Sequence, residues 1–203
     1  MRRPVRVKGA RPARGTPAGT RARLVAAAAD VLNRHGYHRT DSNKIARAAG
    51  YAPGTFYKHF ADKRAILLAA YEEWVSAEWR AVEDEIQAGG SATAVAARIV
   101  DLVLSLHRRW RGLRSSLLSL VATDPVVRRF YREQRRRQLR MLSRRRAVTH
   151  GPPRSAEEDA VLLFTLERTC DAIANGEARD LGLNPAATVT LLHDLVSSHI
   201  ARR

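Results

Sequence analysis

Residues 41–67 decide the fold, and they read DSNKIARAAGYAPGTFYKHFADKRAIL. Thr40 or Asp41 offers the side-chain oxygen that caps a short helix, and Gly50 suits its end because glycine readily adopts a left-handed backbone. Pro53 then stands where a first-turn proline belongs, which predicts a further short helix through the letters GTFYKHF. Two short helices separated by a glycine-containing turn are typical of a helix-turn-helix.

The second of these short helices has two different faces. At the helical period, Phe56 and Phe60 lie on one face, while Thr55, Lys58 and His59 lie on another. We expect the two phenylalanines to anchor the helix in the core of a small domain. The opposite face is then free to enter the major groove of DNA.

Neighbouring residues are suited to contacts with the DNA backbone. Tyr57 lies on the flank, where a phenol can reach a phosphate oxygen, and Gly54 allows close approach of the backbone. Lys63, in the first turn of a longer helix capped by Asp62, adds a cation and unpaired amides. The segment that reads the DNA sequence is therefore placed within residues 41–60. The expected DNA-binding residues are Thr40, Lys44, Tyr51, Pro53, Gly54, Thr55, Tyr57, Lys58, His59 and Lys63.

Helical periodicity continues on both sides of this motif. Upstream, Leu24, Ala28 and Leu32 share one face of a helix that Gly36 ends. No segment alternates apolar and polar residues as a half-buried strand does. The fold is therefore predicted to be all-α, with a three-helix helix-turn-helix domain at the N-terminal end and a helical C-terminal domain. The later helices are expected over residues 62–86, 91–110, 113–121, 124–146, 155–175 and 185–201.

The charge of the chain is strongly positive and lies mostly near its beginning. The formal net charge is +16, and residues 1–70 carry +12 of it. Such an excess favours a polyanionic partner, either nucleic acid or an anionic membrane face. The single cysteine, Cys170, excludes an internal disulfide framework, and no apolar run could span a bilayer or serve as a secretion signal. We therefore expect a cytoplasmic protein without membrane partners.

Residues 1–19 are predicted to form a disordered basic arm, because they hold too few large apolar side chains to build a core. This arm could follow a minor groove, as homeodomain arms do. We favour the alternative, an unstructured tail that only strengthens non-specific binding. Its cationic residues are Arg2, Arg3, Arg6, Lys8, Arg11 and Arg14.

Residues 45–67 resemble the signature of the TetR family of regulators, which runs approximately I-A-x-x-A-G-V-S-x-G-T-x-Y-x-H-F-x-S-K-x-x-L. Residues 20–40 are similar to the first helix of that family, whereas the rest of the chain agrees only in size and helix pattern. Two positions depart from the pattern. Ala52 replaces the usual serine, so a hydroxyl that caps the helix and contacts phosphate is missing, and Ser42 replaces an apolar residue.

The resemblance implies a division of labour between two domains. The recognition helix and its flanks would contact DNA, and Thr55, Tyr57, Lys58, His59 and Lys63 match the positions concerned. Residues 20–66 would form the DNA-binding domain, and residues 67–203 a helical effector-binding and dimerisation domain. The last two long helices of each subunit would form a four-helix homodimer interface. The apolar stripes of segments 155–175 and 185–201 support that interface independently.

The resemblance also implies a ligand cavity between the helices of the second domain. The candidates for its lining are equally suited to filling an ordinary core, which we consider the more frequent role of such residues. Together they predict an apolar or amphipathic ligand. They are Trp79, Leu106, Trp110, Leu117, Leu120, Val121, Phe130, Phe164 and Cys170.

The arginine-rich segment 124–146 has two interpretations. We favour a solvated helix face over a dock for an anionic group of a ligand. The arginines are Arg128, Arg129, Arg132, Arg135, Arg136, Arg137, Arg140, Arg144, Arg145 and Arg146.

The function expected from these features is binding of a near-palindromic operator by a dimeric repressor that a small molecule releases. The alternative is an architectural protein that coats DNA with little sequence preference, driven by the positive charge. We find no spacing of His and Cys that suits a metal and no catalytic motif, so neither a metal, a cofactor nor an enzyme is expected.

Overall fold

The computed structural model describes residues 15–148 and 155–201, and for residues 144–148 it describes the backbone only. Within these residues all regular structure is helical, as predicted. The helices are α1 (Pro17–His35), α2 (Ser42–Ala48), α3 (Pro53–Tyr57), α4 (Lys63–Gln87), α5 (Ala92–Arg109), α6 (Arg111–Val121), α7 (Pro125–Val148), α8 (Ala156–Ala174), α9 (Glu177–Asp180) and α10 (Pro185–Ala201).

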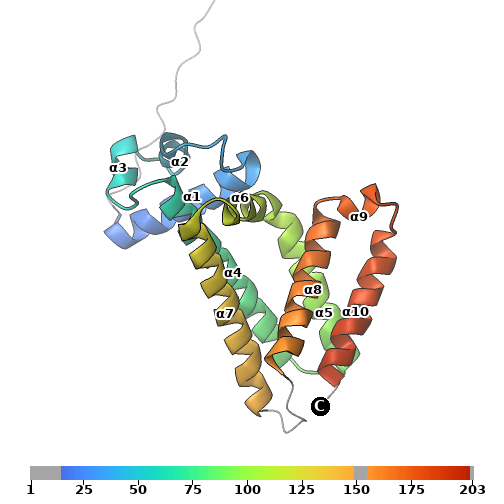
Figure 1. Cartoon of the computed structure of the whole chain (residues 1–203). Helices are drawn as coiled ribbons and strands as arrows, with labels where there is room; N and C mark the ends of the chain where they lie inside the picture. Colours follow the sequence, from blue (N-terminus) through green and yellow to red (C-terminus); the bar gives the residue numbers. More distant parts are fainter. Residues whose placement is uncertain (1–14, 149–154, 202–203) are drawn as a thin grey trace, which may run out of the picture.

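Helices α1, α2 and α3 form a small group at one end of the molecule (Figure 1). Helix α4 leaves this group and runs into the larger C-terminal bundle, where α5, α7, α8 and α10 lie lengthwise. Helix α6 crosses beneath the small group and packs against α1. In the bundle, α10 packs mainly on α5 and to a lesser extent on α8.

Side-chain caps fix where several helices begin. Asp41 Oδ1 accepts a hydrogen bond from the Lys44 amide, and Asp62 Oδ1 accepts one from the Ala65 amide, each at 2.7 Å. Ser155 forms a complete capping box with Glu158. These bonds satisfy amides that a helix leaves without internal partners. The caps expected from the sequence at Asp62 and Ser155 are confirmed.

Two predicted boundaries and one connection are corrected by the structure. Helix α1 begins at Pro17, so residues 17–19 of the expected arm are helical; Thr16 caps them by accepting from the Gly19 amide at 3.2 Å. Helix α3 ends at Tyr57, three residues before the predicted end. The short helix α9 lies where only a loop was expected. The cationic residues 2–14 of the expected arm lie outside the described residues.

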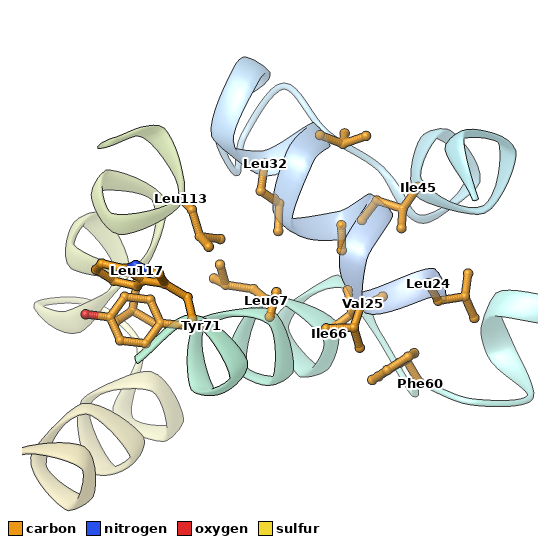
Figure 2. Close-up of a cluster of buried hydrophobic side chains, with 14 of the residues drawn as sticks. Leu24, Val25, Leu32, Ile45, Phe60, Ile66, Leu67, Tyr71, Leu113 and Leu117 are labelled. Atoms are coloured by element: carbon orange, nitrogen blue, oxygen red, sulfur yellow. The ribbon is translucent and has the colours of Figure 1, made fainter. Parts of the chain in front are cut away.

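The buried apolar side chains form two clusters. The first joins the N-terminal helices to α4, α6 and α7, and the second lies among α4, α5, α8 and α10. Figure 2 shows the first cluster continuing along α4 from Ile66, beside Phe60, to Tyr71, beside Leu117. The expected domain boundary at residues 66 and 67 thus falls inside a continuous core, which makes α4 a shared element of both parts.

Candidate nucleic-acid interface and sensor core

Helix α3 is fixed by the two phenylalanines. Phe56 is fully buried and Phe60 is 5% exposed, and their ring centroids lie 5.9 Å apart. The Phe56 carbonyl accepts hydrogen bonds from the amides of His59 and Phe60, so a tight turn continues the helix to the second anchor. The phenylalanines therefore occupy the core, as their spacing predicted.

The outer side of this helix faces solvent. Tyr57 is 58% exposed, Lys58 is exposed, and Thr55 and His59 are half-buried. Pro53 and Gly54 are exposed at its N-terminal end, and Lys44 is half-buried in the preceding helix. Because the buried phenylalanines fix the rotation of α3, these side chains are held at the surface as one group.

Three residues expected at the DNA lie differently. Thr40 is 3% exposed, and its hydroxyl donates to the Gly36 carbonyl at 2.8 Å, so a contact through its side chain is contradicted. The Tyr51 hydroxyl is also buried. Lys63 Nζ donates to the carbonyls of Tyr37 and Thr40, both at 2.7 Å, and burial lowers its pKa. Lys63 therefore fastens the first turn of α4 to the turn between α1 and α2.

A second set of contacts joins the group of α1, α2 and α3 to the larger bundle. Asn33 Oδ1 accepts from the amides of Gly112 and Leu113, and Asn33 Nδ2 donates to the Arg109 carbonyl at 2.8 Å. Arg64, one residue after Lys63, bridges Asp62 and Asp124. Helices α1 and α4 are thus tied to the α5–α6 and α6–α7 junctions by polar contacts as well as by the core.

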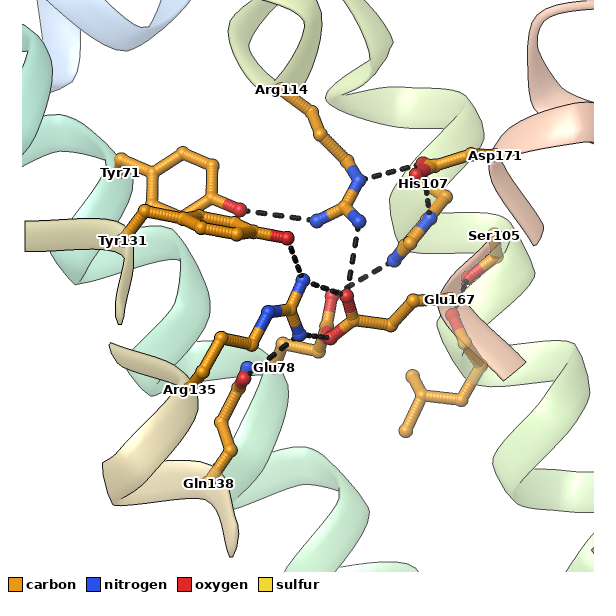
Figure 3. Close-up of polar contacts among 11 residues, drawn as sticks. Tyr71, Glu78, Ser105, His107, Arg114, Tyr131, Arg135, Gln138, Glu167 and Asp171 are labelled. Atoms are coloured by element: carbon orange, nitrogen blue, oxygen red, sulfur yellow. Dashed lines mark hydrogen bonds and ion pairs between the residues drawn. The ribbon is translucent and has the colours of Figure 1, made fainter. Parts of the chain in front are cut away.

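The bundle contains a buried group of charged side chains that we call the ionic cluster (Figure 3). It is formed by Glu78, His107, Arg114, Arg135, Glu167 and Asp171. Arg114 donates to Asp171 at 2.6 Å, to Glu167 at 3.0 Å and to the Tyr71 hydroxyl at 3.0 Å. Arg135 pairs with both oxygens of Glu167. Burial alone would raise the pKa of Glu167, but Arg114 and Arg135 more than offset this and lower it.

The ionic cluster was missed by the sequence reasoning. Arg114 lies between Leu113 and Leu117 in a short apolar helix, and Glu167 and Asp171 interrupt the apolar pattern of α8 one turn apart. Charged residues at core positions of different helices are a signal for buried pairing, since an isolated buried charge is very unfavourable. Their partners, however, lie more than fifty residues away in the chain.

The arginine-rich helix α7 is neither a uniformly solvated face nor an open anion dock. Arg135 is turned inward to Glu167, and Arg128 donates to the carbonyls of Val121 and Ala122 at the end of α6. Arg137 pairs with Glu72 of α4 at 2.7 Å. These arginines hold α7 against its neighbours. Arg136 and Arg140 pair with Glu133, Arg129 and Arg132 are exposed, and the side chains of residues 144–146 lie outside the description.

The segment that contains these helices is similar to a known protein family. Residues 24–70, which contain α2, α3 and the first turns of α4, match the family model described as "Bacterial regulatory proteins, tetR family". This part of the chain is similar to the TetR family of regulators. The match covers the helix-turn-helix and the two phenylalanine anchors, and confirms the resemblance found in the motif.

Two regulators from Bacillus subtilis are similar to this chain over different lengths. The fatty acid metabolism regulator protein of Bacillus subtilis (strain 168) is 33% identical over 84 residues, which is 41% of each chain, so the match spans about two fifths of that relative. A transcriptional regulator FadR from Bacillus subtilis, solved in complex with stearoyl-CoA, has a TM-score of 0.64 at 20% identity, covering 90% of this chain and 98% of that one.

A TetR-family transcriptional regulator from Streptomyces coelicolor has a TM-score of 0.67 at 18% identity, covering 90% of this chain and 95% of that one. At such identities the structures show a shared fold and nothing further. The likeness in fold therefore extends beyond residues 24–70, to about nine tenths of the chain.

The residues expected to line a ligand cavity lie in different parts of the structure. Phe164 is 52% exposed on α8, which contradicts its assignment to an internal pocket. Leu117 and Leu120 are buried in the first cluster and Cys170 in the second, where burial raises the pKa of its thiol to about 12. Leu106 is half-buried, and Trp79, Trp110, Val121 and Phe130 pack partly buried against the first cluster.

An open groove of about 350 Å³ lies instead between α8 and α10. None of the expected ligand-lining residues contributes to it. Large apolar side chains of the same two helices remain exposed in this single chain, among them Val161 (65%) and Leu195 (44%), which line the groove, and Leu191 (69%). The groove is lined by Glu157, Glu158, Val161, Leu162, Thr165, Leu195, Ser198 and His199.

None of the helices among the described residues is long and apolar enough to cross a membrane.

Proposed function

We propose that this chain is a sequence-specific DNA-binding transcriptional repressor that a small molecule releases from its operator. The observation that carries the proposal is the fixed orientation of α3, with Phe56 and Phe60 inside and Tyr57 and Lys58 outside, within the segment that matches the TetR-family model. A helix held in this way can present Thr55, Lys58 and His59 to base edges while Tyr57 reaches a phosphate.

The proposed repressor is a homodimer that pairs through α8 and α10. Both helices keep large apolar side chains at the surface of the single chain, including Val161, Phe164, Leu191 and Leu195. Large apolar side chains left exposed on two packed helices are typical of a protein interface. A two-fold axis through it would present two copies of α3 to successive major grooves, which lie about 34–36 Å apart.

The proposed switch acts through α4. This helix begins at Lys63, which holds the turn between α1 and α2, and it carries Glu78 into the ionic cluster. A ligand that prefers a shifted position of α4 would move the two copies of α3 away from the spacing of successive major grooves. The Bacillus subtilis regulator bound to stearoyl-CoA supports an amphipathic ligand as the class to test first.

The decisive experiment is a footprint on the DNA that flanks the gene of this protein, followed by a salt series. A repressor protects one near-palindromic site and keeps a large affinity gap between that site and random DNA as salt rises. An architectural DNA-coating protein, the second candidate favoured by the +16 charge, loses affinity for both DNAs in parallel. Equal binding to both DNAs would overturn the repressor proposal.

A further inference from the structure

The ionic cluster contains an unbalanced charge. Among the described residues it brings together three carboxyl groups, those of Glu78, Glu167 and Asp171, but only two guanidinium groups, those of Arg114 and Arg135. Glu78 and Arg114 are 6% and 5% exposed, so solvent does little to compensate. A buried cluster of this composition has one uncompensated negative charge, which a proton on Glu78 neutralises in the empty protein.

The existing contacts are distributed unevenly among the three acids. Glu167 receives bonds from both arginines, and Asp171 receives bonds from Arg114 at 2.6 Å and from His107 Nδ1 at 2.9 Å. Glu78 receives none of them. Its Oε2 atom is buried without a hydrogen-bond partner among the described residues, as is Nε2 of His107, and the two atoms are 3.9 Å apart.

A donor atom placed between these two atoms would be within hydrogen-bond reach of both, because 3.9 Å is less than twice a hydrogen-bond length of about 2.8 Å. Both atoms are buried, so the neighbouring side chains must move apart to admit it. The surroundings are aromatic. The ring of Trp74 lies 6.0 Å from that of His107 and 4.9 Å from that of Tyr71, and the indole nitrogen of Trp74 also has no partner in the described part of the chain. Glu78 follows Trp74 by one turn of α4, so their side chains share a face.

We propose that Glu78 and His107 receive the protonated amine of an effector whose remaining body is apolar. An ammonium group carries both the missing positive charge and N–H donors for the two unpartnered acceptors. This assignment rests on the proposed function only in calling the ligand an effector; the site itself is independent of DNA binding.

Two other guests fit the ionic cluster less well. A carboxylate ligand would need a free guanidinium, but Arg114 and Arg135 are already paired with the chain's own acids. A metal ion would need several converging ligands, and the described residues contain no group of three His, Cys, Asp or Glu side chains arranged to hold one. The amine therefore accounts for the charge count without breaking an existing pair.

Binding of the amine is coupled to release of a proton. Burial, with Glu167 as the next cause, raises the pKa of Glu78 to about 8, so the empty cluster holds its extra proton near neutral pH. When the ammonium group enters, it supplies the balancing charge, and the proton on Glu78 leaves to solvent. One proton is thus exchanged for one bound cation.

The test is calorimetric titration of the full chain, without DNA, by octylamine, 1-octanol and octanoate, which share an alkyl chain and differ in charge. We expect octylamine to bind at least about tenfold more tightly than either other probe, a difference of about 1.4 kcal/mol. Repeating the titration near neutral pH in buffers of different ionisation enthalpy should reveal release of close to one proton. Tighter binding of octanoate, equal binding of 1-octanol or absence of proton release would overturn the proposal.

Glu78→Gln provides the matched variant, because glutamine keeps the shape of a protonated glutamic acid and cannot ionise. It should lose the preference for octylamine over 1-octanol, while Glu73→Gln, at an exposed position of the same helix, should keep it. An unchanged preference in Glu78→Gln would also refute the site. Operator binding is measured separately. Amine binding without release of the operator would support the amine site and count against the ligand-released repressor. Release of the operator by a small molecule, without amine binding at Glu78, would support the repressor and count against the amine site.

Discussion

Asn33 and Gly112 are in direct contact across the junction between the DNA-binding helices and the bundle. The Gly112 amide donates to Asn33 Oδ1 at 2.9 Å, and a Cβ atom placed on Gly112 would lie only 1.9 Å from the Asn33 backbone oxygen. No side chain fits into that space, since the neighbouring atom belongs to the backbone and cannot rotate away. Glycine is therefore required there by close approach of α1 and α6.

Gly112→Ala is expected to destabilise the protein despite the better helix propensity of alanine. Propensity favours alanine by about 1 kcal/mol, but the forced separation of two packed helices costs more, so we expect a net loss on the order of 2 kcal/mol. Chemical denaturation measures the free energy of unfolding. Ser115→Ala, at an exposed position of the same helix, should change it little. Equal stability of the Gly112→Ala variant would show that α1 and α6 are free to move apart.

Lys58→Ala is expected to weaken operator binding without affecting the fold. Lys58 is exposed beyond the buried anchors Phe56 and Phe60, so its removal leaves the core intact. If Lys58 contacts a base, its loss should weaken binding to the operator by about 1–3 kcal/mol and binding to random DNA little. If Lys58 contacts a phosphate, its loss should weaken binding to both DNAs and reduce the salt slope by about 1. Fluorescence anisotropy over a salt series separates the two roles. Arg80→Ala, which removes one exposed charge from α4, is the control.

Lys63→Met is expected to act on stability more than on the salt dependence of DNA binding. The variant removes the donor from the carbonyls of Tyr37 and Thr40, and partly buried acceptors left unsatisfied cost about 1–3 kcal/mol. Thermal unfolding should therefore reveal a lower Tm. If stability is instead unchanged and the salt slope falls by about 1, Lys63 is a phosphate contact after all.

The sequence predicted those features that depend on local spacing. The caps at Asp62 and Ser155 and the burial of Phe56 and Phe60 follow from positions within one or two turns of helix. Their prediction required no knowledge of which helices meet. The all-helical fold could be predicted for the same reason, because helical periodicity is visible in each segment alone.

The features that the sequence did not predict depend on contacts between distant segments. Lys63 was expected to face DNA, but its ammonium reaches carbonyls 26 and 23 residues earlier in the chain. Phe164 was expected to line an internal ligand cavity, but it is 52% exposed on a side of α8 that this chain does not cover. Pairing of Arg114 with Glu167 likewise requires α6 and α8 to be neighbours, which no local pattern reveals.

The stability of the protein is expected to fall as pH rises through the neutral range, because of Glu78. A carboxyl group whose pKa is raised to about 8 on folding binds a proton in the native state that the unfolded chain has already lost. Between about pH 5 and pH 8 this lowers the free energy of unfolding by up to about 1.4 kcal/mol per pH unit. The charged groups packed around Glu78 are His107, Arg114, Arg135, Glu167 and Asp171.

Glu78→Gln should remove this pH dependence, since glutamine does not titrate. Glu167 and Asp171 have lowered pKa values, so they are ionised in both states over this range and add no slope of their own. Denaturation at a series of pH values should therefore show the free energy of unfolding of the variant increasing relative to that of the wild type as pH rises. Glu73→Gln is the control, and parallel curves for wild type and Glu78→Gln would mean that Glu78 is ionised in the folded protein.

Leu195→Glu is expected to dissociate the proposed dimer. Leu195 and Val161 line the same groove between α10 and α8 and are 44% and 65% exposed in the single chain, so a carboxylate there would be buried without a partner in the interface. Light scattering should report a mass of 22.6 kDa for the variant and twice that value for the wild type. Val126→Glu, at an exposed apolar position of α7, should remain dimeric.

The same variant tests whether dimerisation supplies operator affinity. A monomer holds one half-site, and the loss of the linked second half-site should weaken binding by about 10²–10⁴-fold. Because Leu195 lies in α10, far along the chain from α3, the Leu195→Glu protein should retain its helical circular dichroism spectrum and its weak binding to random DNA. A dimer that persists in Leu195→Glu would move the interface away from α8 and α10 and leave their apolar side chains to another partner.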